Sequence, residues 1–283
     1  MDPSDVFTVT SQEKKFSFTN EVYVVNGTHV VKFCKGDEEG FAREAIMYQK
    51  LHGKLPVPTL VTFDDSKKKV PTLYMIYEYV PGETLYAVWP ILSDVERESM
   101  VEQLCALIRK LASCKLDLSS PNWHDYWYEK LITRLEKATS LLTPEEIKKI
   151  GTYIEEHHHT LREAKLVPVH PDLHFDNVIV KDKKIVCLLD FERIRMASLD
   201  FNLDCLRRTQ RNPETYAESD DVPKEQYSKV MEWTKKYAPE LFDFPDVDHR
   251  LNLYAVAGDL SMLQKFPKSE SMRRRLWSSI HNE

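Results

Sequence analysis

The sequence predicts an α+β fold with two lobes, a small N-terminal antiparallel β-lobe with one helix and a large, mainly helical C-terminal lobe. Runs of β-branched residues around a single helical pattern fill residues 1–80. Val80-Pro81-Gly82 then interrupts both the strand period and the helix period, as a linker between two units does. Beyond it, capping signals and amphipathic repeats predict a series of helices. We therefore expect residues 1–80, 81–85 and 86–283 to form the N-terminal lobe, a hinge and the C-terminal lobe.

The small lobe is predicted from four segments rich in β-branched and aromatic residues, at Glu21–Val25, Thr28–Cys34, Thr59–Phe63 and Leu73–Tyr79. Asn26-Gly27, between the first two, is the strongest short signal for a hairpin turn. Asp37–His52 is the predicted helix, because its apolar residues recur at helical spacing and form one stripe of Phe41, Ala45, Tyr48 and Leu51. The lobe is therefore a sheet that carries one helix.

The large lobe contains two capping boxes, at Ser93 to Glu96 and at Thr143 to Glu146, and each predicts the start of a helix. The first helix should run to about Lys115. Further helices are predicted at His124–Leu141, Leu199–Gln210, Pro223–Tyr237, Val247–Lys265 and Ser269–His281. A β-island interrupts them, with strands at Val167–Val169, Val178–Lys181 and Ile185–Leu189 and a tight turn at Asp182-Lys183.

Composition excludes several classes of protein. Hydrophobic residues make up 42% and charged residues 30% of the chain, the balance of a soluble globular protein. No apolar run approaches the roughly 18 residues needed to cross a bilayer, and residues 1–15 lack the apolar core of a signal peptide. The five cysteines are widely spaced without a C-x-x-C pair, which fits reduced thiols. We expect a cytoplasmic protein.

The net charge of -6 disfavours a nucleic-acid-binding surface, so that neither nucleic acid nor membrane is an expected partner. A mild acidic excess would help to attract a cationic small molecule, although it also serves solubility. The oligomeric state is left open by the sequence.

Polar and ionisable residues are concentrated in the loop from His170 to Asn177 and in the segment Leu189-Asp190-Phe191-Glu192 after the predicted hairpin. Near-continuous apolar strands flank both segments, so Asp172, Asn177 and Asp190 can meet at the mouth of one hairpin. Two carboxylates and an amide oxygen are hard ligands of the kind that Mg²⁺ accepts beside water and phosphate oxygens.

Phosphoryl transfer requires few protein groups: a metal clamp, a lysine on the phosphates, and a carboxylate that orients the attacking hydroxyl and takes its proton. All three can be assigned in this chain. The sequence therefore predicts a kinase that uses Mg²⁺ and ATP or GTP and phosphorylates a hydroxyl group of a small molecule.

The run H-x-D-L-x-x-x-N, a hairpin and D-F-E resembles the aminoglycoside phosphotransferase and choline kinase family, distant relatives of the protein kinases. The family's loop is usually H-G-D-x-H-x-x-N, matched here by His170, Asp172, His174 and Asn177. The resemblance implies a protein-kinase-like bilobal fold, with Asp172 as catalytic base and Asn177 and Asp190 as magnesium ligands. It further implies that His170 braces the loop and that His174 orders it or lies near the acceptor.

The phosphate-binding lysine can be argued from strand geometry. In Thr28–Cys34, Val30 and Lys32 share one face, whereas Val31 and Phe33 point the other way, into the core of the small lobe. A lysine at this position after a small apolar residue matches the V-A-I-K pattern, in which the shared face covers the nucleotide.

Lys35 has the opposite parity to Lys32 and stands at the end of the strand, so we prefer Lys32. Glu44 lies beside the inward stripe of the predicted helix and is the best partner for Lys32. Glu38 and Glu39 belong to the exposed first turn, where acids merely suit the helix dipole.

The hinge from Glu78 to Leu85 is similar to the family's E-x-x-x-G-x-x-L pattern. The resemblance implies that backbone groups around Glu78 and Val80 hydrogen-bond the nucleotide base. Because backbone groups perform this recognition, the choice between ATP and GTP stays open.

Three departures argue against a protein kinase itself. No G-x-G-x-x-G loop precedes Lys32, since F-T-N-E occupies residues 18–21. No A-P-E follows Asp190, and the loop begins H-P-D rather than H-R-D. Pro171 replaces the family's usual glycine, which changes the loop backbone without removing a chemical group.

Two alternative functions remain open at this stage. His170, Asp172, His174 and Asp176 alternate as in a comb of metal ligands, which would suit a metal-dependent hydrolase if the segment were a strand. The other is a catalytically silent pseudokinase that only binds nucleotide, although such a protein has usually lost one of the catalytic or metal-binding residues.

The acceptor site is the least determined feature. By resemblance, acidic residues of the large lobe would bind an aminoglycoside-, choline- or sugar-like acceptor, and the candidates are Glu192, Asp200, Asp204 and Asp259. Asp200 or Asp204 could instead occupy the family's structural D-L position after the metal aspartate.

Overall fold

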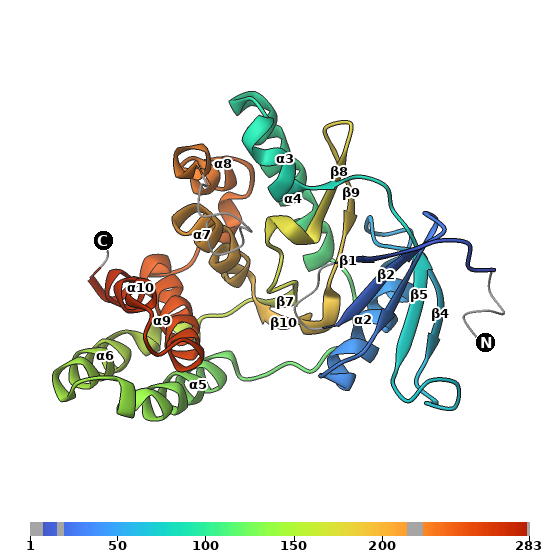
Figure 1. Ribbon diagram of the computed structural model, residues 1–283. Helices are drawn as coiled ribbons and strands as arrows, with labels where there is room; N and C mark the ends of the chain where they lie inside the picture. The colour runs from blue at the N-terminus through green and yellow to red at the C-terminus, as the bar shows by residue number, and fades with distance from the viewer. Residues whose placement is uncertain (1–7, 16–19, 214–222, 282–283) are drawn as a thin grey trace.

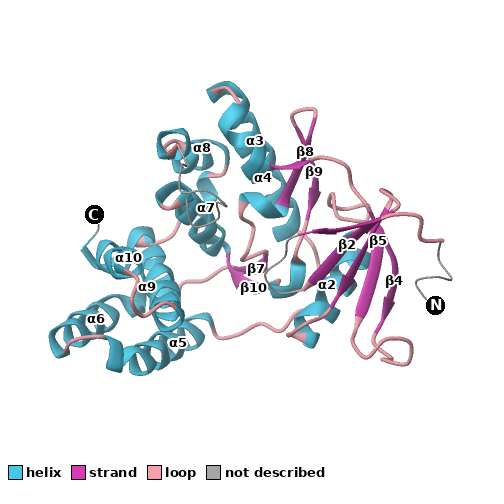
Figure 2. Ribbon diagram, in the orientation of Figure 1, coloured by secondary structure: helices cyan, strands magenta, loops and turns pink. Residues whose placement is uncertain are grey.

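A computed structural model describes residues 8–15, 20–213 and 223–281. Two lobes face each other across the hairpin that precedes Asp190, as predicted (Figure 1). Figure 2 shows strands concentrated in the N-terminal lobe and helices in the C-terminal lobe. No helix in the described ranges is long and apolar enough to cross a membrane.

The N-terminal lobe is a five-stranded antiparallel sheet in the order β1-β2-β3-β5-β4. Its strands are β1 (Gln12–Lys15), β2 (Glu21–Val25), β3 (His29–Phe33), β4 (Leu60–Asp64) and β5 (Tyr74–Glu78). The hairpin turn forms as predicted, because Asn26 and Gly27 both have positive φ, 54° and 65°. Strand β1 was not predicted, since Q-E-K-K is exposed and has no apolar alternation; pairing with β2 alone holds it.

Helix α2 (Glu38–Leu51) is capped by Asp37, whose side chain accepts a hydrogen bond of 2.9 Å from the Gly40 amide. Its predicted apolar stripe is buried against the sheet. Val30 and Lys32 are paired across β3 and β5 with Tyr77 and Met75, on the face that α2 covers.

The expectation that Val31 and Phe33 face the core of the lobe needs correction. Val31 packs with Val25, Tyr74 and Ile76 in a small separate cluster, with Phe33 partly buried at its side. The larger core lies on the face of Lys32, because that is the face on which the helix packs.

The linker is attached to the large lobe. After β5, the short strand β6 (Glu83–Thr84) pairs with β8 (Val178–Lys181), which itself pairs with β9 (Lys184–Leu188). A Cβ atom on Gly82 would lie 2.7 Å from the carbonyl oxygen of Val180, so only glycine allows this close approach. The hinge therefore runs directly over the catalytic hairpin.

The C-terminal lobe contains α3 (Leu85–Val88), α4 (Asp94–Ala112), α5 (Trp123–Ala138), α6 (Pro144–His157), α7 (Asn202–Arg211), α8 (Val230–Tyr237), α9 (Val247–Lys265) and α10 (Glu270–His281). Both predicted capping boxes are present, at the starts of α4 and α6. The predicted helix at Leu199–Gln210 begins as the 3-10 turn η6 (Leu199–Phe201). The one at Pro223–Tyr237 splits into η8 (Lys224–Tyr227) and α8.

The β-island agrees with the prediction and gains one strand. Asp182 and Lys183 turn between β8 and β9 with φ of 50° and 59°. Strand β7 (Leu166–Val169) pairs with β10 (Arg195–Ser198), which was not predicted because R-M-A-S lacks the alternation of a strand. This pair and the hairpin frame the loop that carries the candidate catalytic residues.

Candidate functional site

The loop between β7 and β8 has a buried apolar support. Leu173 and Phe175 are buried, and the ring of Phe175 lies 4.7 Å from that of Trp89. The loop closes in a 3-10 turn, η4 (Phe175–Asn177), which leads directly into β8. Asp172 is half-buried and directly precedes Leu173, so packing of these apolar residues fixes the position of its backbone.

His170 connects the loop to the end of the strand before Asp190, in agreement with the positioning role that the resemblance implies. Its Nε2 donates to the carbonyl of Leu189 over 2.8 Å, and its ring lies 4.6 Å from Phe191. Burial lowers the pKa of His170, so the ring is neutral at physiological pH. A neutral imidazole that donates through Nε2 links the loop to the strand end before Asp190.

Asn177 joins the same network. Its Nδ2 donates to the backbone carbonyl of Asp172 over 2.8 Å and lies 3.3 Å from Nε2 of His174. Its own carbonyl accepts from the amide of Leu189 over 2.9 Å. No hydrogen bond within the described residues uses Oδ1 of Asn177, which leaves this oxygen available to a ligand.

Asp190 adopts a left-handed conformation, with φ 63° and ψ 61°, which is uncommon for a residue other than glycine. Its amide donates to the hydroxyl of Tyr48 over 3.4 Å. Because this backbone is unfavourable by itself, the surrounding contacts must hold it, as they often do at functional sites. The result is a carboxylate that stands at the hairpin mouth.

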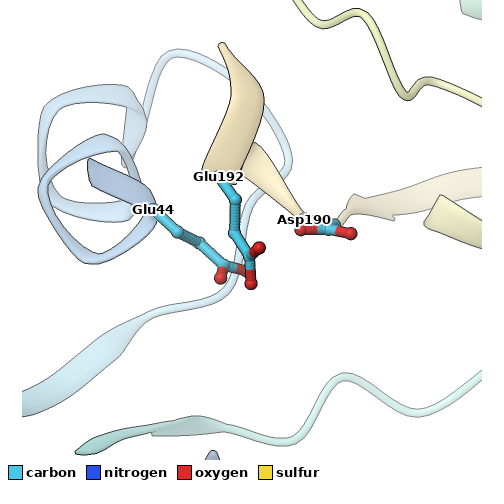
Figure 3. A group of neighbouring side chains, drawn as sticks. All are labelled: Glu44, Asp190 and Glu192. Atoms are coloured by element: carbon cyan, nitrogen blue, oxygen red, sulfur yellow. The ribbon is translucent and has the colours of Figure 1, made fainter. Parts of the chain in front are cut away.

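Lys32 lies beside Asp190 in a buried corner. Its Nζ contacts Oε2 of Glu44 at 2.6 Å, as predicted, and Oε1 of Glu192 at 3.1 Å. Tyr48 donates to the other oxygen of Glu44 over 2.5 Å. Figure 3 shows the carboxylates of Glu44 and Glu192 directed at one another from α2 and the segment after β9, with Asp190 beside them.

The electrostatics of this corner keep the lysine charged. Burial disfavours the ammonium, but the negative charges of Glu44 and Asp190 outweigh it and raise the pKa of Lys32. Burial also raises the pKa of Glu44, against the attraction of Lys32. Since Lys32 contacts Glu44 and Glu192 directly, Asp190 is the carboxylate of this group left for another cation.

Glu192 was a candidate for acceptor binding, and its position contradicts this. Besides Lys32, its Oε1 accepts from Nδ2 of Asn20, and its carbonyl accepts from Arg43 over 2.8 Å. The turn η5 (Phe191–Arg193) directs the side chain toward β3 rather than toward the helices of the large lobe. Glu192 belongs to the corner of Lys32.

Asp200 is likewise corrected. It is fully buried, and Arg250 binds both of its oxygens at 2.8 Å. Ser198 and Tyr254 also donate to it, over 2.5 Å and 3.0 Å. An acid with no exposed surface and all these partners has no oxygen free for an acceptor, which fits the structural alternative that the sequence left open for Asp200.

Asp204 and Asp259 lie near a cavity of about 460 Å³ between α7, α9 and α10, and Asp259 lines it. Each acid faces an arginine: Asp204 is 2.9 Å from Arg208, and Asp259 is 3.6 Å from Arg275. These two candidates therefore remain close to open space, with cations as their neighbours.

The comb of metal ligands does not form. Residues 170–177 are a turn and a 3-10 helix rather than a strand, so alternate side chains do not share a face. His170 is directed at a carbonyl, and His174 lies 3.6 Å from Asp176. In the described part of the chain, the group of three acids around Lys32 is the one convergent set of metal-ligating side chains.

The backbone amides of the hinge differ in whether the protein already uses them. The amides of Glu78 and Tyr79 donate to the carbonyls of Thr59 and Thr28 over 2.9 Å and 2.8 Å. The amide of Val80 has no backbone partner among the described residues, so it is available to a ligand. Of the F-T-N-E segment, residues 18 and 19 lie outside the described residues.

Three residues around the site escaped the sequence analysis. Tyr48 links Glu44 to Asp190, Asn20 holds Glu192, and Arg193 lies 3.4 Å from the carboxylate of Asp172. Tyr48 follows Glu44 by four positions, which is a recognisable helical pair. Arg193 follows Asp190 by three positions, a spacing that carries no signal without the turn η5.

Comparison with known proteins agrees with this geometry. A sequence model described as the phosphotransferase enzyme family matches residues 15–206. A search of curated proteins gave no significant match.

The chain is similar in structure to the ADP-bound aminoglycoside phosphotransferase APH(2″)-Ib, with 20% identity, a TM-score of 0.69, and coverage of 99% of this chain and 95% of that one. For the ternary complex of APH(2″)-IIa with streptomycin and ATP, the identity is 22% and the TM-score 0.67, and the match covers 97% of this chain and 92% of that one. For APH(2″)-IIia with GDP and kanamycin, the identity is 15% and the TM-score 0.72, and the match covers 98% of this chain and 92% of that one. At these identities, the likeness shows the fold.

Proposed function

Because the chain belongs to the phosphotransferase enzyme family, we propose that it transfers the γ-phosphate of ATP or GTP to a hydroxyl group of a small molecule, with Asp172 as catalytic base. One observation carries this proposal: a single set of contacts joins the loop of Asp172 to Asn177, to the strand end before Asp190 and, through Tyr48 and Glu44, to Lys32. These are the groups that phosphoryl transfer requires.

The nucleotide would lie under the face of the sheet that carries Val30 and Lys32. The ammonium of Lys32, held by Glu44, would bind phosphate oxygens, and the amide of Val80 and carbonyl of Glu78 would bind the base. Neighbouring folds are known with ADP, ATP and GDP, which supports a nucleotide donor and leaves both bases open.

The reacting hydroxyl would meet the carboxylate of Asp172, which is partly exposed at the loop. A carboxylate in this place orients the hydroxyl and takes its proton as the phosphorus–oxygen bond forms. The guanidinium of Arg193, 3.4 Å from this carboxylate, would stabilise the negative charge of the transferred group. His170 and His174 would act as positioning residues through the loop and Asn177.

Mg²⁺ fits the residues at the hairpin mouth. Oδ1 of Asn177 and the carboxylate of Asp190 are hard oxygen donors that other side chains leave open, and they would hold the ion. When bound, Mg²⁺ would supply positive charge that offsets the charge of the phosphate oxygens.

The test is nucleotide binding with and without Mg²⁺, measured by calorimetry and thermal shift on the wild type, Asp190→Asn and Asp182→Asn. We expect Mg²⁺ to strengthen binding of ATP or GTP in the wild type and in Asp182→Asn, whose exposed carboxyl is in the β8–β9 turn. Asp190→Asn should lose this dependence. Binding that ignores Mg²⁺ in the wild type would contradict the proposal, and binding without turnover would favour the pseudokinase.

A further inference from the structure

The cavity between α7, α9 and α10 has a strongly asymmetric charge. Of the described residues, twelve line it, and six of these are cationic and one is acidic. The cations are Arg207, Arg208, Arg211, Lys224, Arg274 and Arg275. The whole chain carries a net charge of -6, so this concentration is local and opposite in sign to the average of the protein.

Arg207 contributes buried positive charge that the protein does not fully satisfy. It is 7% exposed, and its Nη1 donates to Asn252 over 2.8 Å. Its Nη2 is buried and has no hydrogen-bond partner among the described residues. Burial and the nearby charge of Arg211 lower the pKa of Arg207 to about 10. An unsatisfied buried guanidinium is costly, and an anion in the cavity would satisfy it.

Among the described residues, two acids lie at this cavity, and each faces an arginine. Asp204 is engaged with Arg208, and the one acid that lines the cavity, Asp259, is near Arg275 and accepts from Ser279 over 3.4 Å. Burial raises the pKa of Asp259 to about 6, so its negative charge is lost only below about pH 6. Among the described residues that line the cavity, positive charge therefore predominates.

Helix α7 connects this cavity to the proposed base. Asp204, Arg207, Arg208 and Arg211 follow helical spacing, so they form one stripe about 10 Å long. Burial raises the pKa of the Cys205 thiol at the start of this stripe to about 12, against the charge of Arg208, and the charge of Asp172 in the loop raises it further. Figure 1 shows α7 between the β-island and the α9–α10 pair.

We propose that this cavity binds the phosphate group of an anionic acceptor, so that the protein phosphorylates a hydroxyl group of a compound that already carries a phosphate. The inference rests on the proposed function and names its substrate class. Guanidinium groups bind phosphate oxygens through paired, charge-assisted hydrogen bonds. A volume of about 460 Å³ suits a ligand of the size of a sugar phosphate.

This assignment replaces the cationic acceptor that the sequence suggested. An aminoglycoside or choline would bring positive charge against six cationic side chains, with one carboxylate, Asp259, as its partner among the described lining residues. Like charges at this spacing repel, which excludes such molecules in favour of anions.

Matched compounds test the charge directly. Glycerol and glycerol phosphate, and glucose and glucose phosphate, differ only in the phosphate group. Gluconate tests a carboxylate in place of the phosphate, and choline and kanamycin test cationic compounds. Binding is measured by thermal shift without nucleotide, and then transfer is measured with Mg²⁺ and ATP or GTP. We expect stabilisation by the phosphorylated members and at least about a tenfold lower KM for them than for their neutral partners. Equal or better use of neutral or cationic compounds would overturn the inference and leave the proposed function intact.

Charge variants show where the anion binds. In Arg211→Gln with Arg274→Gln, both at exposed positions, affinity for glycerol phosphate should fall about tenfold or more, whereas Asp259→Asn should raise it. Arg162→Gln, an exposed arginine outside the cavity, is the matched control and should change nothing. Nucleotide-induced stabilisation reports that each variant is folded. Affinity that falls equally in the control, or falls in Asp259→Asn, would reject the cavity as the site.

Discussion

Asp172 and Asp200 are the same type of residue in neighbouring segments, but their surroundings give them different properties. Asp172 is partly exposed beside Arg193, whereas both oxygens of Asp200 are consumed by Arg250 inside the protein. The sequence could place both near the site, because each belongs to a recognisable motif. It could not tell which one was enclosed, because Arg250 is fifty positions away in the chain.

Tyr48 gives the first test at this scale. Tyr48→Phe removes the hydrogen bond to Glu44 and the acceptor for the Asp190 amide, so both Lys32 and Asp190, the proposed metal ligand, lose support. We expect unfolding free energy to fall by about 1–3 kcal/mol and affinity for the magnesium nucleotide to fall by up to about tenfold. Urea denaturation and calorimetry measure the two effects.

Tyr128→Phe is the matched control, because Tyr128 donates to Glu155 over 2.7 Å at the surface. Its stability should change by less than about 0.5 kcal/mol and its nucleotide affinity should not change. If the two variants behaved alike, the link from Tyr48 to the site would have no functional weight.

Asp259 predicts a pH dependence of stability. Its pKa is about 6 in the folded protein, where burial raises it, and near the ordinary value of about 4 in the unfolded chain. Between these values the unfolded chain loses the proton first, so stability falls as pH rises. Relative to Asp259→Asn, the wild type should lose up to about 3 kcal/mol between pH 4 and 6. Denaturation of both proteins across this pH range measures the difference in their unfolding free energies. A difference that does not change with pH would contradict the prediction.

At the scale of secondary structure, elements with their own local signals were predictable. The Asn26-Gly27 turn, the capped helix α2 and the two capping boxes each form where the sequence places them. Strands β1, β6 and β10 escaped because backbone pairing holds them and their side chains show no strand pattern. The core of the small lobe was assigned to the wrong face of β3, because only the packing of α2 decides between two apolar faces.

The buried ion pair between Asp200 and Arg250 joins η6 to α9, and Arg250 also donates to the carbonyl of Glu163 over 2.9 Å. Asp200→Asn leaves a buried guanidinium without its counter-charge, so unfolding free energy should fall by about 3–5 kcal/mol. The exposed pair of Glu145 and Lys149 on α6 is the control, and Glu145→Gln should cost less than about 0.5 kcal/mol. Urea denaturation decides, and a similar small cost for both would show that the buried pair does not stabilise the large lobe.

For the whole molecule, the order of motifs along the chain was enough to predict a bilobal kinase-like fold and the pairing of Lys32 with Glu44. The acceptor class was not predictable in this way. A net charge of -6 suggested a cationic acceptor, but net charge does not show where charges lie. Folding brings the basic residues of α7 and α10, more than sixty positions apart, to one cavity.

Transfer of labelled γ-phosphate tests the central claim most directly. ATP and GTP are offered with Mg²⁺ and a panel of neutral, cationic and phosphorylated hydroxyl compounds to the wild type and Asp172→Asn. We predict transfer to a hydroxyl compound by the wild type and a kcat about 10²–10⁴-fold lower in the variant, with nucleotide binding preserved. Equal rates of transfer in the two proteins would contradict the assignment of Asp172 as the base.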